Sequence, residues 1–312
     1  MRVVIPEFMD EAAVDALRRR FEVVFDASLV QRRPELLRDV GAAHGLIVRN
    51  RTRVDKELLE AAPMLTVVGR LGVGLDNIDL TACEARRIEV IPARGANALA
   101  VAEYVIAVSL ILLRGAFLAT DAVAAGSWPR EALSGGREVA GRTLGIVGFG
   151  SIGQVTARLA RGLGMEVIAF DAEIDSMAPL WIEQQVTPRG LDELLREADV
   201  VSLHVPLTPK TRHLIDAGRL ALMKPGAVLV NTARGGIVEE AALASMLRAG
   251  RLAGAALDVF EMEPLQAASP LAGCPNLLLT PHIAGVTRES NLRVSTLIAD
   301  RVAAALEARG KG

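Results

Sequence analysis

Aromatic residues and cysteines are scarce in this sequence. Phe, Trp and Tyr together make up 3% of the 312 residues, and the two cysteines, Cys83 and Cys274, lie far apart without histidines at metal-ligand spacing. A fold held together by several disulfides is therefore excluded, and the pattern indicates no metal site. We expect both thiols to be reduced and buried.

The sequence also lacks an excess of charge of either sign, and it lacks long hydrophobic runs. A net charge of −2 gives no general attraction for nucleic acids or acidic membranes. The apolar run at residues 3–5 is too short for a signal peptide, and the longest apolar candidate, residues 101–118, is interrupted by Glu103, Arg114 and Gly115. These features predict a cytoplasmic protein that contacts neither nucleic acid nor membranes.

Aliphatic residues, in contrast, are abundant and occur in short runs. Hydrophobic residues make up 51% of the chain, and the apolar runs alternate with segments of helical periodicity. This pattern is typical of parallel sheets covered by helices, and the length suits two domains. We therefore predict an α/β fold with two doubly wound parallel-sheet domains.

The predicted elements fall into two series. The strands of the first series are residues 3–5, 22–25, 45–48, 66–68 and 88–91, and those of the second are residues 143–147, 166–170, 200–203, 227–230, 252–257 and 277–279. The main helices are residues 10–20, 34–40, 55–61, 79–86, 98–125, 154–162 and 287–308. Asn97 is the expected N-cap of the long helix that starts at residue 98.

Residues 148–153, with the sequence Gly-Phe-Gly-Ser-Ile-Gly, follow one predicted strand and precede a predicted helix. This is the order that a dinucleotide-binding turn requires. Gly148 would permit the tight turn, Gly150 would let the backbone approach a pyrophosphate, and Gly153 would let helix and strand pack closely. Free N–H groups at the start of the helix would bind the phosphates. A glycine turn can also arise for steric reasons alone, but the flanking strands favour nucleotide binding.

Asp171 ends the next predicted strand, 21 residues after Gly150 (171 − 150). A carboxylate at a spacing of about 20 residues binds the ribose hydroxyls of the nucleotide. Ala172 follows it, rather than an arginine or serine that would accept a 2′-phosphate, and the carboxylate itself would repel that phosphate. The predicted cofactor is therefore NAD rather than NADP.

Three polar islands follow later strands, and each carries one residue with catalytic chemistry. They are residues 231–236, 258–264 and 280–285. Because ligands bind at the carboxyl ends of parallel strands, Arg234, Glu263 and His282 should gather there. Histidine can take or return a hydroxyl proton, arginine can hold a carboxylate bidentately, and glutamate can orient the histidine ring. Taken one at a time, Arg234 could cap a strand, Glu263 could be a loop acid and His282 could be a core histidine. Together the three residues favour hydride transfer between NAD and a 2-hydroxy acid.

With these motifs the sequence resembles the D-isomer-specific 2-hydroxyacid dehydrogenases, in particular their phosphoglycerate dehydrogenase-like branch. The resemblance is carried by residues 68–79, Asn97 with residues 101–103, the glycine turn and the three islands. It implies an NAD-dependent oxidoreductase in which Arg234, Glu263 and His282 are catalytic, with His282 as the proton donor in reduction. It also implies cofactor contacts at Gly148, Gly150, Ser151, Ile152, Gly153, Asp171, Val205, Pro206, Thr232, Ala233, Arg234, Asp258, His282 and Gly285.

The resemblance also implies a domain layout and an assembly. The nucleotide-binding Rossmann domain, residues 97–284, is expected to be inserted in a flavodoxin-like substrate domain made of residues 1–96 and 285–312. A homodimer is expected, formed largely by the long helix after Asn97 and the segment around Trp128.

Arginines in the first domain bear on the choice of substrate. Arg49, Arg51 and Arg53 would share one face if the chain stayed extended after residue 48, although a solvated strand end is an equal alternative for the last two. The resemblance places substrate contacts at Arg49, Asn50, Arg70, Gly72, Val73 and Gly74. It leaves open whether Arg51, Arg53 or Arg94 contacts the substrate.

An arginine-rich pocket favours a 2-hydroxy or 2-oxo acid with a second anionic group. One candidate is 3-phosphoglycerate. The other is (S)-3-sulfolactate, because residues 7–13 and 49–52 resemble the sulfolactate dehydrogenases of this branch. A reductase of hydroxypyruvate or glyoxylate is the alternative among enzymes. An NAD-sensing, corepressor-like interaction protein is the alternative from another class.

Overall fold

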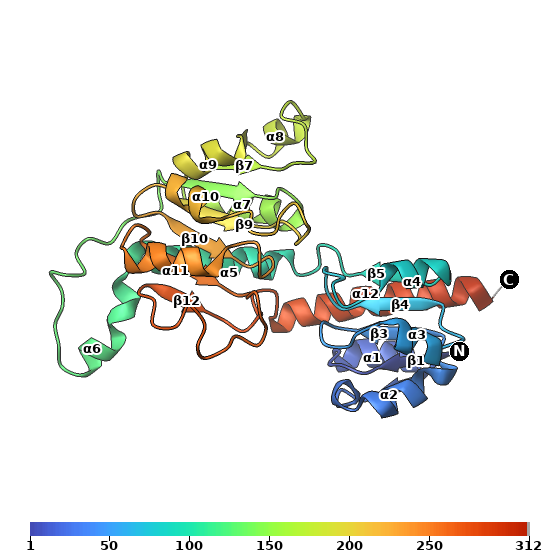
Figure 1. The fold of residues 1–312 in the computed structure, drawn as a ribbon. Helices are drawn as coiled ribbons and strands as arrows, with labels where there is room; N and C mark the ends of the chain where they lie inside the picture. Colours follow the sequence, from blue (N-terminus) through green and yellow to red (C-terminus); the bar gives the residue numbers. More distant parts are fainter. Residues whose placement is uncertain (311–312) are drawn as a thin grey trace. The chain divides into compact units, whose positions relative to one another are not determined.

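The computed structural model describes residues 1–310, without the side chain of Leu118, and the chain separates into two compact units (Figure 1). The first unit consists of Met1–Asn97 and Val286–Gly312, and the second of Ala98–Gly285. Residues 311 and 312, at the end of the predicted substrate domain, lie outside the described residues. Each unit contains one parallel sheet with helices on both faces, so the predicted α/β fold class is confirmed.

The first unit holds a five-stranded parallel sheet in the order β2-β1-β3-β4-β5. The strands are β1 (Arg2–Ile5), β2 (Glu22–Phe25), β3 (Gly45–Val48), β4 (Val67–Arg70) and β5 (Glu89–Pro92). The helices are α1 (Glu11–Arg18), α2 (Arg33–Asp39), α3 (Lys56–Ala61), α4 (Leu80–Ala85) and α12 (Arg288–Gly310), with 3₁₀ turns η1 (Leu29–Gln31) and η2 (Val40–Ala42). All five strands lie within about two residues of the predicted ranges, because strands buried on both faces are continuous apolar runs.

Helix α12 returns to this sheet and covers one of its faces together with α1. Val294, Ile298 and Val302 recur every four residues on one side of the helix and are buried against the strands. Gly69 in β4 permits this contact, because a Cβ atom there would lie only 2.7 Å from side-chain carbons of both Ile298 and Val302. Helices α2, α3 and α4 cover the opposite face.

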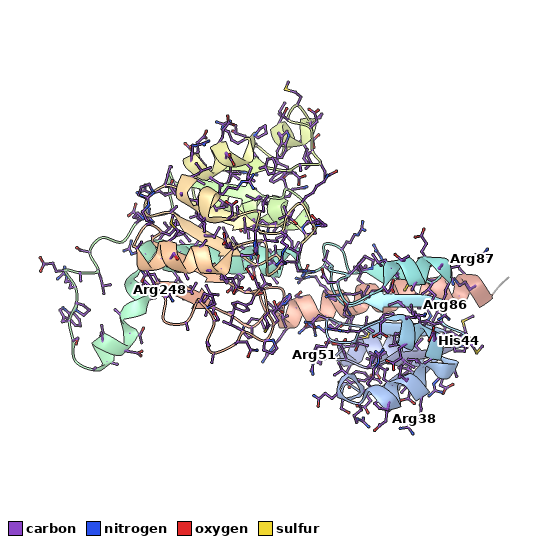
Figure 2. All side chains as sticks on the ribbon, viewed as in Figure 1. Arg38, His44, Arg51, Arg86, Arg87 and Arg248 are labelled. Atoms are coloured by element: carbon purple, nitrogen blue, oxygen red, sulfur yellow. The ribbon has the colours of Figure 1, made fainter. Side chains whose placement is uncertain are left out.

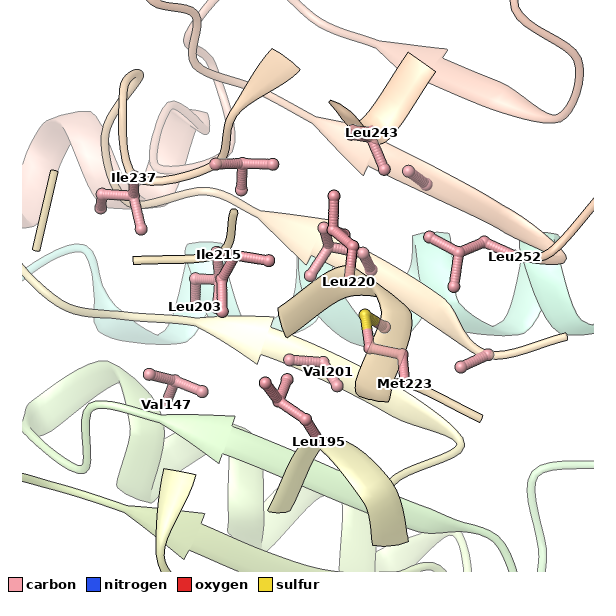
Figure 3. Close-up of a cluster of buried hydrophobic side chains, with 14 of the residues drawn as sticks. Val147, Leu195, Val201, Leu203, Ile215, Leu220, Met223, Ile237, Leu243 and Leu252 are labelled. Atoms are coloured by element: carbon pink, nitrogen blue, oxygen red, sulfur yellow. The ribbon is translucent and has the colours of Figure 1, made fainter. Parts of the chain in front are cut away.

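The second unit holds a seven-stranded parallel sheet in the order β12-β11-β10-β9-β6-β7-β8. The strands are β6 (Thr143–Val147), β7 (Glu166–Phe170), β8 (Thr187–Pro188), β9 (Val200–Leu203), β10 (Val228–Asn231), β11 (Gly254–Leu257) and β12 (Leu277–Leu279). The helices are α5 (Ala98–Arg114), α6 (Thr120–Ala124), α7 (Ser151–Gly162), α8 (Pro179–Glu183), α9 (Leu191–Glu197), α10 (Ala217–Leu222) and α11 (Glu240–Arg248), with the 3₁₀ turn η3 (Ala116–Ala119). Helices α9, α10 and α11 bury one face of the sheet (Figure 3), and α5 and α7 bury the other.

The strand order of this second sheet creates a ligand-binding edge. Strand β6 lies between β7 and β9, so the chain runs outward from β6 in both directions. In open parallel sheets the crevice at such a reversal is the usual nucleotide site. The glycine turn leaves β6 at this point, which puts the predicted cofactor residues at the same edge.

Two sequence expectations about the long helix differ from the structure. The long helix predicted for residues 98–125 ends at Arg114, because Gly115 takes a left-handed conformation with φ of 67°, and the chain continues through η3 into the short α6. The Oδ1 atom of Asn97 has no hydrogen-bond partner among the described residues, so this side chain does not cap α5.

Both cysteines are free, but only Cys83 is buried; Cys274 is partly exposed, because it lies in the turn-rich connection before β12 rather than in a sheet core. Within residues 1–310, no helix is both long and apolar enough to cross a membrane.

Candidate active site

The glycine turn between β6 and α7 is closed toward the sheet and open on its outer side. Gly148 has a φ of 96°, and a Cβ atom there would lie 2.8 Å from the backbone carbonyl of His204. A Cβ atom at Gly153 would lie 2.4 Å from the carbonyl oxygen of Gly148, so neither position tolerates a side chain. At Gly150, where α7 begins, a Cβ atom would meet no other atom within 4 Å. This open helix N-terminus fits a pyrophosphate group.

Asp171, at the end of β7, belongs to the same turn. Its Oδ2 atom accepts a hydrogen bond from the Phe149 N–H at 2.7 Å, and its Oδ1 atom accepts one from the Glu173 N–H at 2.9 Å. The carboxylate also lines a cavity of about 620 Å³, together with Ile174, Trp181 and Arg189. Sequence spacing predicted the position of Asp171 but not that it ties the glycine turn to β7.

The other predicted cofactor residues follow the carboxyl ends of strands in this sheet. They are Ser151 and Ile152 after β6, Val205 and Pro206 after β9, Thr232 and Ala233 after β10, and Gly285 after β12. His204 precedes Val205, and its Nε2 atom lies 2.9 Å from the Ser202 hydroxyl. Burial lowers the pKa of His204 to about 4, which favours the neutral form of its ring.

Arg234, Glu263 and His282 come together although they follow three different strands. The Nδ1 atom of His282 lies 2.8 Å from the Oε2 atom of Glu263, whose Oε1 atom accepts the Phe260 N–H at 3.2 Å. Burial alone would raise the pKa of Glu263, but the hydrogen bond and charge of His282, the Phe260 N–H and the charge of Arg234 outweigh it and hold the pKa below its usual value. Glu263 is therefore ionised at neutral pH and leaves the Nε2 atom of His282 free of this pairing.

Asn231, which the sequence analysis missed, fixes the turn that carries Arg234. It is the last residue of β10 and is buried. Its Oδ1 atom accepts the Ala233 N–H at 3.0 Å, and its Nδ2 atom donates to the Arg234 carbonyl at 2.9 Å. The signal for it was present, since an asparagine ending an apolar strand needs local partners.

Asp258 holds the loop that carries His282. Its Oδ1 atom accepts hydrogen bonds from the Thr280 hydroxyl at 2.6 Å and the Ile283 N–H at 2.8 Å, and its Oδ2 atom accepts the Ala284 N–H at 2.8 Å. The Thr280 hydroxyl also lies 2.6 Å from the hydroxyl of Tyr104 in α5. These contacts support His282 in a left-handed conformation with φ of 57°. Asp258, expected as a cofactor residue, thus has both carboxylate oxygens engaged in positioning this loop.

In the first unit, Arg49 and Arg70 lie at the carboxyl ends of neighbouring strands. Arg70 pairs in register with Val48, the residue before Arg49. The Nη2 atom of Arg49 donates to the Oδ1 atom of Asn291 at 2.9 Å, and its guanidinium lies 5.6 Å from the ring centre of Phe8. Burial lowers the pKa of Arg49, while the charge of Glu7 opposes this shift, so the guanidinium is a fixed and partly desolvated cation.

The glycines after β4 make room for Arg70. Gly72 has a φ of 152°, and a Cβ atom there would lie 1.6 Å from the Nη1 atom of Arg70. The same Nη1 atom donates to the Leu71 carbonyl at 3.2 Å. Val73 and Gly74 follow in this turn, with Val73 exposed.

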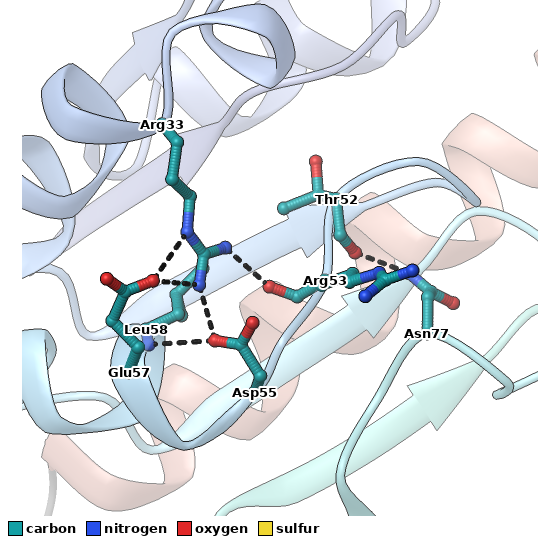
Figure 4. A network of polar contacts seen from close by, with 7 residues as sticks. All are labelled: Arg33, Thr52, Arg53, Asp55, Glu57, Leu58 and Asn77. Atoms are coloured by element: carbon teal, nitrogen blue, oxygen red, sulfur yellow. Dashed lines mark hydrogen bonds and ion pairs between the residues drawn. The ribbon is translucent and has the colours of Figure 1, made fainter.

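The expectation that three arginines share one face does not hold, because the backbone bends at residues 50–52. Arg51 is exposed (Figure 2), and Arg53 and Arg94 are exposed as well. The carbonyl of Arg53 accepts a hydrogen bond from the Nη1 atom of Arg33 at 2.8 Å (Figure 4). Of Arg49, Arg51 and Arg53, only Arg49 has a side-chain hydrogen bond to another of the described residues.

Comparison with known proteins bears on the whole chain. Residues 106–284 match the family described as "D-isomer specific 2-hydroxyacid dehydrogenase, NAD binding domain". An (S)-sulfolactate dehydrogenase of Chromohalobacter salexigens is 55% identical over 98% of this chain and 99% of that protein. A D-3-phosphoglycerate dehydrogenase of Archaeoglobus fulgidus is 39% identical over 97% of this chain, which spans only 56% of that longer protein. A crystal structure of a Thermus thermophilus protein, 38% identical, matches with a TM-score of 0.89 over 99% of this chain and 97% of that one.

Proposed function

Because this chain belongs to the D-isomer-specific 2-hydroxyacid dehydrogenases and uses NAD, we propose that its substrate is a D-configured hydroxy acid with a second anionic group. (S)-3-Sulfolactate is the first candidate and 3-phosphoglycerate the second. We assign the second anionic group of the substrate to residues of the first unit, and the cofactor and the catalytic residues to the second. The observation that carries the proposal is Arg49, a partly desolvated guanidinium fixed by Asn291 and Phe8 beside Arg70.

The number of fixed cations supports a doubly anionic substrate. A simple hydroxy acid has one carboxylate, and Arg234 can hold it in a bidentate pair. Within the first unit, Arg49 and Arg70 lie at neighbouring strand ends, and a sulfonate or phosphate offers several oxygens to two guanidinium groups. The 55% identical relative is named an (S)-sulfolactate dehydrogenase, which favours sulfonate over phosphate.

The proposed catalytic roles follow from the contacts of the second unit. Arg234 binds the carboxylate and polarises the substrate oxygen, and the Nε2 atom of His282 takes the hydroxyl proton on oxidation or returns it on reduction. Glu263 holds the Nδ1 atom of His282 and stabilises the imidazolium that forms. The glycine turn and Asp171 would hold NAD, which would supply the acceptor for the hydride of the carbinol carbon. The open glycine turn and the cavity beside Asp171 fit the pyrophosphate and the adenosine half of this cofactor.

The test of the substrate is NAD reduction by the purified protein with (S)-3-sulfolactate, 3-phosphoglycerate, D-glycerate and D-lactate. We expect a strong preference for one doubly anionic acid. Arg49→Ala should raise the KM for that acid by roughly 10- to 100-fold, because it removes a charge-assisted hydrogen-bond donor. Arg38→Ala, which removes an exposed arginine of α2 in the same unit, is the matched control and should change nothing. Activity on the small acids alone would contradict the proposal and favour a glyoxylate or hydroxypyruvate reductase.

We further propose a homodimer formed around the end of α5 and the segment that follows it. The support is a set of exposed apolar side chains: Leu110, Phe117, Val123 and Trp128, the last of which is 79% exposed. Large exposed apolar side chains that cluster along one segment are typical of interfaces.

Sedimentation velocity tests this assembly. The protein should sediment as a dimer, and the double variant Phe117→Ser, Trp128→Ser should sediment as a monomer. The double variant Met177→Ser, Ile182→Ser, which removes two equally exposed apolar side chains elsewhere in the same unit, is the control and should remain dimeric. A monomeric wild-type protein would refute the proposal.

A cytoplasmic location is also proposed. It is supported by the use of NAD and by two free thiols, which stay reduced in that compartment. Recovery of the native protein in a periplasmic or membrane fraction would contradict it.

A further inference from the structure

Glu7 is a buried carboxylate whose charge acts on the guanidinium of Arg49 and which has no catalytic role in the proposed function. It lies just after β1 and is only 4% exposed. Its Oε1 atom accepts the backbone N–H groups of Arg49 at 2.8 Å and Thr52 at 3.0 Å, and its Oε2 atom accepts that of Arg51 at 3.2 Å. A buried carboxylate requires such partners, and here all of them come from one four-residue segment. We name residues 49–52 the anion loop.

Asn77 holds the anion loop by its carbonyl groups. Its Nδ2 atom donates to the carbonyls of Arg49 at 3.0 Å and Thr52 at 2.6 Å, and Figure 4 shows the second of these contacts. Both ends of the loop are thus fixed through their N–H and C=O groups by two side chains from different parts of the chain. Of the four backbone N–H groups in the anion loop, that of Asn50 is the one that donates no hydrogen bond to any of the described residues.

The loop needs this support because it has no sheet ladder of its own. Strand β3 ends at Val48, and the backbone then bends at residues 50–52. The side chain of Arg49 is fixed by Asn291 and Phe8, but those contacts serve an anion only if the Arg49 backbone stays where Glu7 and Asn77 hold it.

The charge of Glu7 argues for a geometric role. A negative charge beneath an anion-binding loop repels the ligand and so weakens its binding. Its hydrogen bonds act in the opposite direction, because they order the arginine before the ligand arrives and so reduce the cost of binding. Removing the charge should therefore lower the KM, whereas removing the hydrogen bonds should raise it. Because the two effects are opposite, the two roles can be separated.

We infer that Glu7 and Asn77 are positioning residues that hold the anion loop in the conformation that binds the second anionic group, a sulfonate or phosphate, of the substrate. They act through the backbone of Arg49 and do not touch the substrate. This inference rests on the proposed function, since it deepens the account of the same substrate-binding residues.

The test uses Glu7→Ala, Glu7→Gln and Asn77→Ala in the full-length enzyme with its preferred doubly anionic acid. In Glu7→Ala and Asn77→Ala we expect the KM to rise by roughly tenfold, with kcat and the Kd for NADH within about twofold of wild type. Glu7→Gln keeps an acceptor for the N–H groups of Arg49 and Thr52 and removes the repelling charge. It should stay close to the wild-type KM. Glu11→Ala, which removes an exposed carboxylate of α1, is the control for net charge.

The outcomes separate the positioning role from the proposed function. If the wild-type enzyme oxidises no doubly anionic acid, the proposed function fails and the positioning role fails with it. If the wild type does so but Glu7→Ala and Asn77→Ala keep its KM, only the positioning role is overturned. The same holds if kcat and NADH affinity fall while the KM rises, as in a protein that has merely lost its fold. A KM for Glu7→Gln as high as that for Glu7→Ala would also overturn it.

Discussion

His282→Ala is expected to lower kcat by roughly 10²- to 10⁴-fold while the affinity for NADH stays near that of the wild type. The imidazole is the group proposed to move the substrate proton, and its Nδ1 atom is bound to Glu263 at 2.8 Å. Removing it takes away the proposed proton transfer but leaves the glycine turn and Asp171, to which we assign cofactor binding. Steady-state kinetics and fluorescence titration with NADH measure the two effects separately.

His213→Ala is a matched control for this experiment. His213 also has a left-handed backbone, with φ of 47°, and its Nε2 atom lies 3.2 Å from the Oε1 atom of Glu261 in the same unit. Its loss should leave kcat within a few-fold of the wild type. Turnover by His282→Ala at the wild-type rate would remove His282 from the mechanism. A loss of similar size in both variants would indicate damage to the loop rather than to proton transfer.

Arg234→Ala is expected to reduce kcat/KM by roughly 10²- to 10⁴-fold, which corresponds to the loss of two charge-assisted hydrogen bonds at ~1.5–3 kcal/mol each. The guanidinium is the cation assigned to the substrate carboxylate and the reacting oxygen, and its charge also lowers the pKa of Glu263. Because Asn231 holds the backbone of this turn independently of the side chain, the fold should persist.

Arg234→Lys distinguishes charge from geometry at this position. Lysine keeps the positive charge but cannot form the planar bidentate pair, so we expect it to recover only part of the lost activity. Full activity in Arg234→Lys would show that charge alone suffices. An Arg234→Ala enzyme with wild-type kcat/KM would exclude Arg234 from substrate binding.

Much of the fold was predictable because local sequence determines it. Continuous aliphatic runs such as residues 143–147 and 200–203 have to be buried on both faces, and parallel strands are the elements that meet this need. The glycine turn was equally predictable from the sequence. Neighbouring atoms leave no room for a Cβ atom at Gly148 or Gly153, so this turn requires glycine at both positions. Gly115 shows the limit of the pattern: its surroundings are apolar and helical, and only its left-handed conformation ends the helix.

The supporting contacts of the site could not be predicted in the same way. Glu7 reaches residues 42 to 45 positions away in the chain, and nothing in its neighbourhood indicates that it is buried. Asp258 was recognised by its motif, but its three hydrogen-bond donors lie beyond the next strand, in the His282 loop. Such contacts depend on how strands align in three dimensions, which a single sequence does not reveal.

The return of α12 to the first sheet has a consequence for biosynthesis. Residues 1–97 are synthesised first and Ala98–Gly285 second. Helix α12, which packs on Gly69, is synthesised only after both of these segments. At a synthesis rate of about 5–20 residues per second, the apolar face of the first sheet stays exposed for roughly 10–40 seconds before α12 can pack on it. During that interval the newborn chain exposes a surface that chaperones bind, whereas the inserted unit can complete its core from one uninterrupted stretch of chain.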